Sequence, residues 1–339
     1  MSSDRLKTLF HAFSAGMADL PVSGRWIAAG IGAGLALPAG FGAALTLVQP
    51  FKPDHDALFR AGFEVTPDWP EASVPRLDGA LILLGRHRRQ NESWLWEAVA
   101  RLKPGATVIV AGGKTEGAQS FAKRLKAAGL DLETAAKHHG LAMVFRRPDD
   151  RASEHIFLQP EADTLAEGRF HTAPGMFSHD RVDAGSRLLA EHLPADLKGR
   201  AADFCAGWGY LAAMLAERAE GIEVIDLFEA DHDALAAARR NLSGLGDQVS
   251  FHWSDLAREP VARSYDVIVM NPPFHTGRAA EPDLGQAVIR MASGACKPGG
   301  ALYLVANRQL PYEATLAACF RKVVTLAEDK TYKVIRAIR

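Results

Sequence analysis

The chain has 339 residues, of which 48% are hydrophobic and 23% charged, and its formal net charge is -1. This composition excludes disordered and low-complexity proteins, and the length predicts two domains rather than one. Three cysteines, Cys205, Cys296 and Cys319, are too widely spaced for a zinc site or a disulfide framework. We therefore expect reduced thiols and no bound metal.

An uncharged stretch runs from Trp26 to Phe51 and is long enough to cross a membrane as a helix. It contains five glycines, together with Pro38 and Pro50, and few large aliphatic side chains. These residues disfavour a membrane helix and favour turns. We interpret the stretch as a strand, a glycine turn and a helix of a globular domain, and expect a cytoplasmic protein without a membrane segment.

Residues 1–150 show a weak alternation of strands and helices. Strands are predicted at Gly79–Leu84 and Ala106–Ala111, and helices at Trp94–Leu102 and Ala118–Ala128. This half carries 18 Lys and Arg residues against 15 Asp and Glu, so its charge alone does not indicate a nucleic-acid partner. We assign residues 1–150 to a first domain.

Residues 151–339, the second domain, alternate more clearly. Strands are predicted at Arg200–Cys205, Ile222–Phe228, Val249–Trp253, Tyr265–Met270 and Ala301–Val305, and helices at Tyr210–Arg218, Asp231–Leu242 and Asp283–Ala295. A last pair of strands, Val323–Leu326 and Tyr332–Ile338, would end a seven-stranded sheet with an antiparallel strand. The two halves predict an α/β fold of two tandem doubly wound Rossmann-like domains.

A glycine turn, Cys205-Ala206-Gly207-Trp208-Gly209, joins a predicted strand to a predicted helix. Glycines let a ligand approach the backbone, and a helix N-terminus offers unpaired N–H groups. Glu229 closes the next strand, where an acid can accept hydrogen bonds from both hydroxyls of a ribose. Asp255 follows the third strand and is either an acceptor for an adenine amino group or a capping residue.

The strand Tyr265–Met270 runs directly into Asn271-Pro272-Pro273-Phe274-His275. The prolines stiffen this loop and lack N–H groups, which leaves the side-chain oxygen of Asn271 and the carbonyl of Pro272 as acceptors. Two acceptors match the two hydrogens of an amino group and turn its lone pair toward an electrophile. Phe274 adds a flat face on which a base stacks, worth about 1–3 kcal/mol.

In these motifs the chain resembles class I S-adenosylmethionine-dependent methyltransferases of the RsmC-like group, which methylate N2 of a guanine in small-subunit ribosomal RNA. The matching segments are Thr172–Asp180 with Asp183, Gly185 and Ser186; Asn271–His275; and Val305–Asn307 with Leu310–Tyr312. The resemblance implies S-adenosylmethionine as the cofactor, bound by Phe177, Asp203, Cys205, Gly207, Gly209, Glu229, Asp255 and Asn271. It implies a catalytic set of Asn271, Pro272 and Phe274, with Pro273, Phe274 and His275 against the substrate base.

The first half resembles the degenerate methyltransferase-like domain of that group, which helps to hold RNA, with Gly112–Gly117 as the best local match. Its glycine cluster, Gly30–Gly34, has no convincing ribose acid about twenty residues further on, so we interpret it as a vestigial turn. Arg86, Arg88 and Arg89 stand where the second half has its Asn-Pro-Pro loop. They form either a solvated loop or a patch that contacts RNA phosphates.

One position departs from the pattern of the group, which has a further glycine where this chain has Cys205. Cysteine is small enough for a ligand to approach, but the backbone there must avoid angles that only glycine adopts. This departure affects the expected affinity for the cofactor more than the identity of the cofactor. No neighbour in the sequence is expected to lower the pKa of the thiol.

We predict methyl transfer from S-adenosylmethionine to N2 of a guanine in 16S (small-subunit) ribosomal RNA, free or within an assembling subunit. Three alternatives stay open: a guanine of 23S ribosomal RNA, an adenine or glutamine amide reached through a similar loop, and a non-catalytic RNA-binding assembly protein with a decayed site. A nicotinamide dehydrogenase that uses Gly30–Gly34 is disfavoured, because no catalytic set of His, Lys and Tyr accompanies the cluster.

Overall fold

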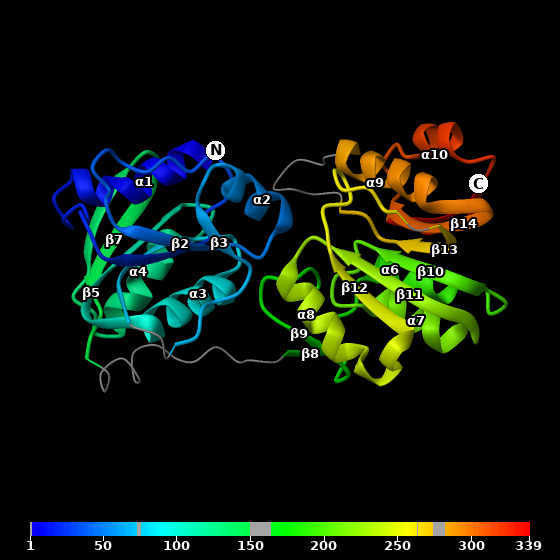
Figure 1. Ribbon diagram of the computed structural model, residues 1–339, viewed down its shortest axis with the longest axis horizontal. Coiled ribbons are helices and arrows are strands. Elements are labelled where there is room, and N and C mark those ends of the chain that lie inside the picture. The colour runs from blue at the N-terminus through cyan, green and yellow to red at the C-terminus, as the bar shows by residue number, and fades with distance from the viewer. Residues whose placement is uncertain (1, 73–75, 150–163, 263, 274–281) are drawn as a thin grey trace. The chain divides into compact units, whose positions relative to one another are not determined.

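The computed structural model describes residues 2–72, 76–149, 164–262, 264–273 and 282–339 (Figure 1). The chain divides into two compact units, Met1–Ala162 and Asp163–Arg339. The sequence predicted a division after residue 150. Each unit contains a seven-stranded sheet with helices on both faces, which is the predicted α/β architecture.

Unit 1 has its strands in the order β3-β2-β1-β4-β5-β7-β6, with β7 antiparallel to both β5 and β6. The strands are β1 (Arg25–Ala29), β2 (Ala44–Val48), β3 (Glu64–Thr66), β4 (Leu77–Leu83), β5 (Leu102–Gly113), β6 (Glu133–Lys137) and β7 (Gly140–Arg146). The helices are α1 (Ser2–Ser14), α2 (Lys52–Arg60), α3 (Arg88–Arg101) and α4 (Ala118–Ala127).

Unit 2 repeats this order as β12-β11-β10-β13-β14-β16-β15. Its main strands are β10 (Lys198–Phe204), β11 (Gly221–Glu229), β12 (Val249–Trp253), β13 (Tyr265–Met270), β14 (Cys296–Asn307), β15 (Lys322–Glu328) and β16 (Tyr332–Ile338), and a hairpin of β8 (Thr164–Ala166) and β9 (Phe170–Thr172) precedes them. The helices are α6 (Ala184–Glu191), α7 (Tyr210–Arg218), α8 (His232–Asn241), the 3-10 helix η1 (Ser243–Gln248), α9 (Pro282–Ala295) and α10 (Glu313–Cys319). The predicted antiparallel ending is confirmed, because β16 runs antiparallel to β14 and β15.

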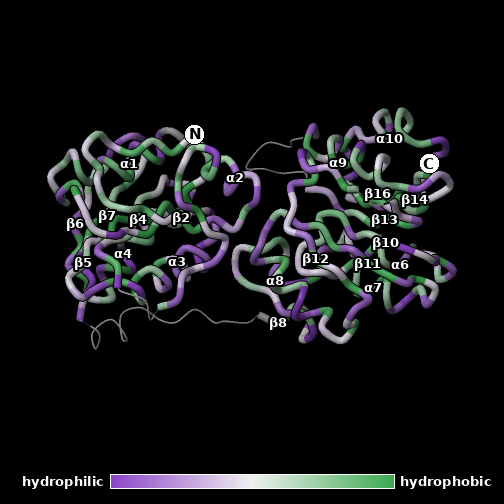
Figure 2. Tube along the Cα trace, viewed as in Figure 1, coloured by the Kyte–Doolittle hydropathy of each residue, from purple (hydrophilic) through white to green (hydrophobic). Residues whose placement is uncertain are grey.

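The sheet of unit 2 lies between two hydrophobic layers, because successive residues of a strand point to opposite faces. Ala201 of β10 belongs to the layer that includes α6, α7 and α8, whereas Ala202 and Phe204 belong to the layer that includes α9 and α10. Figure 2 shows hydrophobic residues along the central strands of each unit. Each large aliphatic side chain buried in this way contributes about 1.5–3 kcal/mol, so the sheet is a rigid base for the loops at its carboxyl edge.

The helix predicted within Trp26–Phe51 is absent, and that part of the prediction is wrong. The strand β1 and the glycine turn are present, but residues 30–43 continue as bends and turns to β2. Gly34 and Gly40 have φ values of +86° and +88°, which no right-handed helix contains, and Pro38 lies between them. Among the helices that the structure describes, none is long and apolar enough to cross a membrane.

The two units share strand register as well as strand order. In unit 1 the last residue of β1 pairs with one residue of β2 and one of β4. In unit 2 the last residue of β10 pairs in the same way with β11 and β13. The pairs are Ala29 with Val48 and Ile82 in unit 1, and Phe204 with Phe228 and Met270 in unit 2. The residues one position after these pairs therefore occupy equivalent places, so that Gln49 corresponds to Glu229 and Leu83 to Asn271.

Gly30 offers a test of the packing around the turn in unit 1. It has a φ of +74°, and an added Cβ would collide with the carbonyl oxygen of Leu83 and lie 2.6 Å from the ring of Trp94. Gly62 has a φ of +89° but open space around it. We expect Gly30→Ala to lower the free energy of unfolding by about 3 kcal/mol or more and Gly62→Ala by about 1 kcal/mol, because only Gly30 adds a clash to the backbone strain.

Urea denaturation of the two variants, followed by circular dichroism, measures this difference. Equal losses would show that backbone conformation alone, and not close packing against β4, requires glycine at position 30.

Candidate active site

The glycine turn between β10 and α7 combines one glycine that faces open space with one that faces the protein. Gly207 has a φ of +54°, and an added Cβ would meet no atom within 4 Å. Gly209 has a φ of +88°, and its added Cβ would lie 3.1 Å from Leu242 and 3.3 Å from Ala238, beside α8. Gly207 therefore leaves room for a ligand, whereas Gly209 allows α7 to begin close to α8.

Cys205 begins the turn with a φ of +60°. Non-glycine residues enter this left-handed region at a cost of about 1–2 kcal/mol, so the backbone keeps the conformation without glycine. Burial raises the pKa of the Cys205 thiol well above its ordinary value, and the charges of Glu229, Asp203 and Asp255 raise it further. The thiol is therefore protonated and unreactive at neutral pH.

Glu229 lies directly beside the glycine turn. Its carboxylate accepts hydrogen bonds from the backbone N–H groups of Gly207 (2.7 Å), Ala230 (2.8 Å) and Asp231 (2.9 Å). Burial raises the pKa of Glu229 to about 7, although these three donors favour the ionised form. A carboxylate next to Gly207 is well placed to accept further donors from a ligand in the open space.

Asp203 is fully buried at the end of β10. Its Oδ2 accepts a hydrogen bond from the N–H of Ala212 in α7 (2.9 Å), and its Oδ1 has no partner among the described residues. Burial raises its pKa well above the ordinary value, and the charge of Glu229 adds to the shift. An unpaired buried oxygen in this place is unusual and marks the region beneath the turn as a polar site.

Asp255 is 7% exposed and makes a turn contact, because no helix begins at this position. Its Oδ1 accepts a hydrogen bond from the N–H of Ala257 (3.1 Å), and its Oδ2 lies 3.7 Å from Nε of Arg258. Its charge also acts on Cys205, so it lies close to the turn. A contact between Asp255 and an adenine stays a prediction.

Asn271, the first residue after β13, is held by two side chains at the start of α6. Its Nδ2 donates to Oδ2 of Asp183 (3.1 Å) and to Oγ of Ser186 (2.8 Å). Because an ionised carboxylate only accepts hydrogen bonds, the NH2 group must face Asp183, and Oδ1 must face away from it. No described residue donates to that oxygen, which is therefore available as an acceptor.

The start of α6 is itself well fixed. Asp183 is its N-cap and accepts a hydrogen bond from the N–H of Ser186 (2.8 Å). The ring of Tyr332 packs so closely on Gly185 that an added Cβ would lie 2.9 Å from it. Burial and the charge of Asp183 raise the pKa of Tyr332, which agrees with a tight contact. The anchor of Asn271 is thus a capped helix packed against β16.

One small cleft brings the amide and the glycine turn together. Its lining residues are Phe177, Ser178, Asp183, Ser186, Cys205, Ala206, Gly207, Trp208, Tyr210, Leu211 and Asn271. The indole N–H of Trp208 donates to the carbonyl of Phe177 (3.0 Å), and the side chain of Phe177 is 56% exposed. Asp203, Gly209, Glu229 and Asp255 do not line the cleft but lie next to residues that do.

The loop after Asn271 is described only in part. Pro272 is buried and Pro273 is exposed. Phe274 and His275, expected at the substrate, lie outside the described residues. The sequence analysis did not find the roles of Asp183, Ser186 and Trp208. An Asp at the start of a helix is a capping signal, but it does not reveal a partner 88 residues away.

Unit 1 lacks the equivalent groups. Gln49 replaces the acid and donates from Nε2 to the carbonyl of Ile31 (2.8 Å), and buried Leu83 replaces the amide. An added Cβ on Gly32 would lie 2.8 Å from Oδ2 of Asp54, whose Oδ1 accepts the N–H of Ala33 (2.9 Å). The turn of unit 1 is thus filled by an acid of its own, as a vestigial turn would be.

The three arginines predicted to contact RNA phosphates lie where a loop meets the start of α3. Arg86 precedes α3, and Arg88 and Arg89 form its first turn. All three are exposed, and Arg88 lies 3.9 Å from Glu92. Among the described residues, no group of three or more His, Cys, Asp or Glu could hold a metal ion.

Comparison with known proteins identifies the family of the chain. The Methyltransferase small domain family matches residues 167–336. The ribosomal RNA small subunit methyltransferase C of Chromohalobacter salexigens is 33% identical over 279 residues, which are 79% of each chain. The chain belongs to the ribosomal RNA small subunit methyltransferase C family. The family member of Stutzerimonas stutzeri is 31% identical over 271 residues, 77% of this chain and 79% of that one.

A solved structure extends the likeness to both units. It is a T. thermophilus 16S rRNA N2 methyltransferase (RsmC) in complex with AdoMet and guanosine, 24% identical, with a TM-score of 0.79. The match covers 99% of this chain and 91% of that chain. The two-domain methyltransferase fold of the family is therefore confirmed.

The charges around Cys205 can be tested through its thiol. Replacing Glu229 by Gln removes one of the carboxylates that raise the pKa of Cys205, so the thiolate fraction at pH 8 should increase. We expect iodoacetamide to alkylate Cys205 in Glu229→Gln about two to ten times faster than in the wild type, since the rate follows the thiolate fraction. Mass spectrometry of tryptic peptides measures the rate, and Cys319 in the same chain is the internal control. An unchanged rate at Cys205 would contradict this electrostatic coupling.

Proposed function

We propose that this protein transfers the methyl group of S-adenosylmethionine to the exocyclic N2 of a guanine in 16S ribosomal RNA. Its curated relatives are named as small-subunit ribosomal RNA methyltransferases, and the T. thermophilus structure contains AdoMet and guanosine. The observation that carries the proposal is the amide of Asn271. Asp183 and Ser186 hold its nitrogen, so its oxygen is the free acceptor in a cleft shared with the glycine turn.

The residues around the turn suit the cofactor. Gly207 borders open space, and Asp203 has an unpaired oxygen beneath the turn. Glu229 would hold the ribose hydroxyls and Asp255 the adenine amino group, with Phe177 and Cys205 at the walls of the cleft. When bound, S-adenosylmethionine supplies a methyl group that its positively charged sulfur has already activated.

The contribution of the chain to the reaction is orientation. In this proposal Oδ1 of Asn271 and the carbonyl of Pro272 accept the two hydrogens of the guanine amino group. They fix its lone pair and stabilise the positive charge that develops on N2. The carboxylate of Asp183 polarises the amide through its NH2 group, which makes the oxygen a stronger acceptor. The target base must leave its stack, at a cost of a few kcal/mol that is smaller in a loop.

Unit 1 would serve the same reaction without chemistry of its own. With Gln49 and Leu83 in place of the acid and the amide, it offers no second transfer site. We propose that it positions the RNA, with Arg86, Arg88 and Arg89 as contacts to phosphates. The substrate is ribosomal RNA, either free or within an assembling small subunit.

Removal of the Asn271 side-chain amide tests the proposal. We expect Asn271→Ala to lower kcat by about 100-fold or more, because loss of one preorganised transition-state contact costs about 2.7–4 kcal/mol. The Kd for S-adenosylhomocysteine should change less than threefold. Transfer of a labelled methyl group to small-subunit RNA and calorimetry measure the two effects, and large-subunit RNA is the negative control.

Asp183→Asn is the matched variant for the contribution of the carboxylate charge. Oδ2 of Asp183 accepts hydrogen bonds from both the N–H of Ser186 and Nδ2 of Asn271, so an asparagine that keeps its oxygen there retains the cap and the contact, and stability should be retained. The negative charge that polarises the Asn271 amide is lost, however, and kcat should fall about tenfold. Normal turnover in Asn271→Ala would refute the assigned role, and normal turnover in Asp183→Asn would refute the contribution of the carboxylate charge.

The pKa of Glu229 gives cofactor binding a pH dependence. The ionised carboxylate accepts hydrogen bonds from both ribose hydroxyls, whereas the protonated group does so poorly. Because burial raises the pKa of Glu229 to about 7, the Kd for S-adenosylhomocysteine should be constant above pH 8 and rise by up to about tenfold per unit below pH 7. Glu229→Gln should bind weakly and without this dependence. Exposed Glu217 is the matched control, since Glu217→Gln should keep the wild-type profile; a flat wild-type profile would argue against the ribose contact.

A further inference from the structure

One aromatic side chain lies at the mouth of the cleft in unit 2. The cleft is lined by the glycine turn and Asn271, and Phe177 is among its other lining residues. Phe177 is 56% exposed, whereas every other described residue that lines the cleft is buried or half-buried. The ring of Phe177 therefore lies where a ligand enters, and most of its surface has no contact with the protein.

The backbone on both sides of Phe177 is fixed. The carbonyl of Phe177 accepts a hydrogen bond from the indole N–H of Trp208 (3.0 Å), and Trp208 is itself only 5% exposed. Oγ1 of Thr172 donates to the carbonyl of His179 (2.5 Å). Ser178 has a φ of +50°, a strained conformation of the kind that is concentrated at functional sites. The loop therefore holds the backbone of Phe177 in one place, although its ring contributes little to packing.

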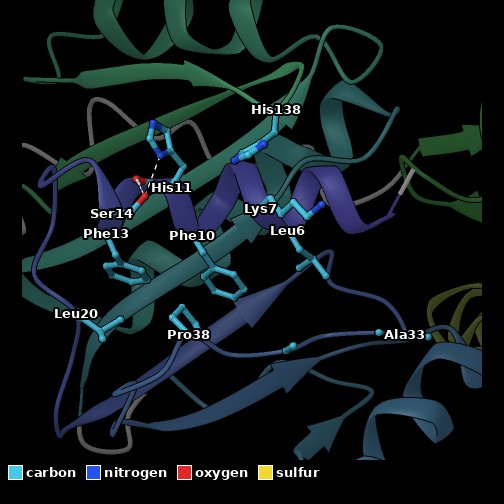
Figure 3. A pocket seen from close by; sticks show the side chains of 12 residues that line it. Leu6, Lys7, Phe10, His11, Phe13, Ser14, Leu20, Ala33, Pro38 and His138 are labelled. Atoms are coloured by element: carbon cyan, nitrogen blue, oxygen red, sulfur yellow. Dashed lines mark hydrogen bonds between the residues drawn. The ribbon is translucent and has the colours of Figure 1, made fainter.

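The aromatic side chains of unit 1 that border a groove beside α1 differ, because they contact one another. Phe10 and Phe13 extend from α1 toward Pro38 (Figure 3). Their rings are 6.5 Å apart, and the ring of Phe13 is also 6.4 Å from that of Phe41. They belong to the hydrophobic packing of unit 1. Phe177 makes no ring contact with a described aromatic side chain, so packing within unit 2 does not explain its position.

The position of Phe177 along the site indicates its partner. Glu229 and Asp255, to which the proposed function assigns the ribose and the adenine, do not line the cleft, whereas Asn271 does. Phe177 therefore lies at the end where the methyl group and the target base meet. At this end the cofactor presents its flexible methionine part, and the guanine presents a flat face. The resemblance to the family assigned Phe177 to the cofactor, but a flat ring matches the base better.

We propose that Phe177 binds the substrate, with its ring stacked on the face of the target guanine while Asn271 binds the amino group at the edge of that base. A base that leaves its stack loses contact with its neighbours, and enzymes replace this contact with aromatic or apolar side chains. Such stacking is possible for any base, because every base has a π-face. Phe177 thus supplies affinity, and Asn271 fixes the nitrogen. The inference rests on the proposed methyl transfer to guanine.

Two substitutions in the full-length protein separate the ring from its apolar character. Phe177→Leu keeps an apolar side chain but removes the ring, and kcat/KM for small-subunit RNA should fall about tenfold. Phe177→Tyr keeps the ring and should recover most of that loss. Transfer of a labelled methyl group at several RNA concentrations measures kcat/KM. Both variants should fold, because the bond to Trp208 uses the backbone of residue 177, and thermal unfolding checks this.

Binding measurements distinguish a base from the cofactor as the partner of the ring. We expect the Kd values of Phe177→Leu for S-adenosylhomocysteine and S-adenosylmethionine, measured by calorimetry, to stay within twofold of the wild type. Leu165→Ala is the matched control for loss of an exposed apolar side chain in unit 2. Leu165 is 46% exposed on β8 and does not line the cleft, so Leu165→Ala should keep the wild-type kcat/KM.

Several results would overturn the inference. A Kd for S-adenosylhomocysteine that rises as much as kcat/KM falls would assign Phe177 to the cofactor. A higher Kd for S-adenosylmethionine alone would place the ring against the positively charged sulfur. Equal losses of kcat/KM in Phe177→Leu and Phe177→Tyr would contradict stacking on a base.

The outcomes also separate this inference from the proposed function. Normal methyl transfer to RNA by Phe177→Leu would overturn the role of the ring and leave the proposed function intact. Absence of methyl transfer to RNA by the wild type would contradict the proposed function, and the inference with it.

Discussion

An amide whose nitrogen is held by a carboxylate can present only its oxygen to a substrate, and the site depends on this constraint. The carboxylate of Asp183 and the amide of Asn271 lie 88 residues apart. They meet because α6 begins with a cap at Asp183 and β13 ends at Asn271, next to the strand that carries the glycine turn. Tyr332 on β16 fixes the helix start from the other side. Orientation of one small group therefore depends on α6 and on strands from β13 to β16, which are separated in the sheet by β14.

Negative charge accumulates beneath the glycine turn. Glu229, Asp203 and Asp255 all raise the pKa of Cys205, and Glu229 and Asp203 themselves have raised pKa values. Without a ligand such a cluster is unfavourable, because burial and mutual repulsion both oppose ionisation. A ligand that carries positive charge would relieve it, and a sulfonium is such a ligand. Cys205 is thus a small residue at the wall of the cleft, and the negative charges around it keep its thiol protonated.

Local signals predicted most of unit 2. The helix α7 and the strands β12 and β13 have the predicted bounds, because continuous apolar runs and a glycine turn determine them within a few residues of sequence. Asp231, the first residue of the helix predicted at Asp231–Leu242, is the N-cap of α8. The helix predicted after the turn of unit 1 is absent. The prediction relied on the apolar composition of this segment, although Pro38 and the glycines disfavour a helix. The contact between Asp183 and Asn271 could not be predicted, since it depends on where two distant elements end.

Unit 1 shares its strand order with unit 2, but residues 30–43, which follow its first strand, contain no helix. Replacing Gln49 and Leu83 by an acid and an amide would supply two side chains but not the helix that follows the glycine turn in unit 2. The carboxylate of Asp54 already satisfies the turn at Gly32 and Ala33. Point substitutions alone therefore cannot restore the site in unit 1. The space that a helix occupies in unit 2 is open in unit 1 to a different use.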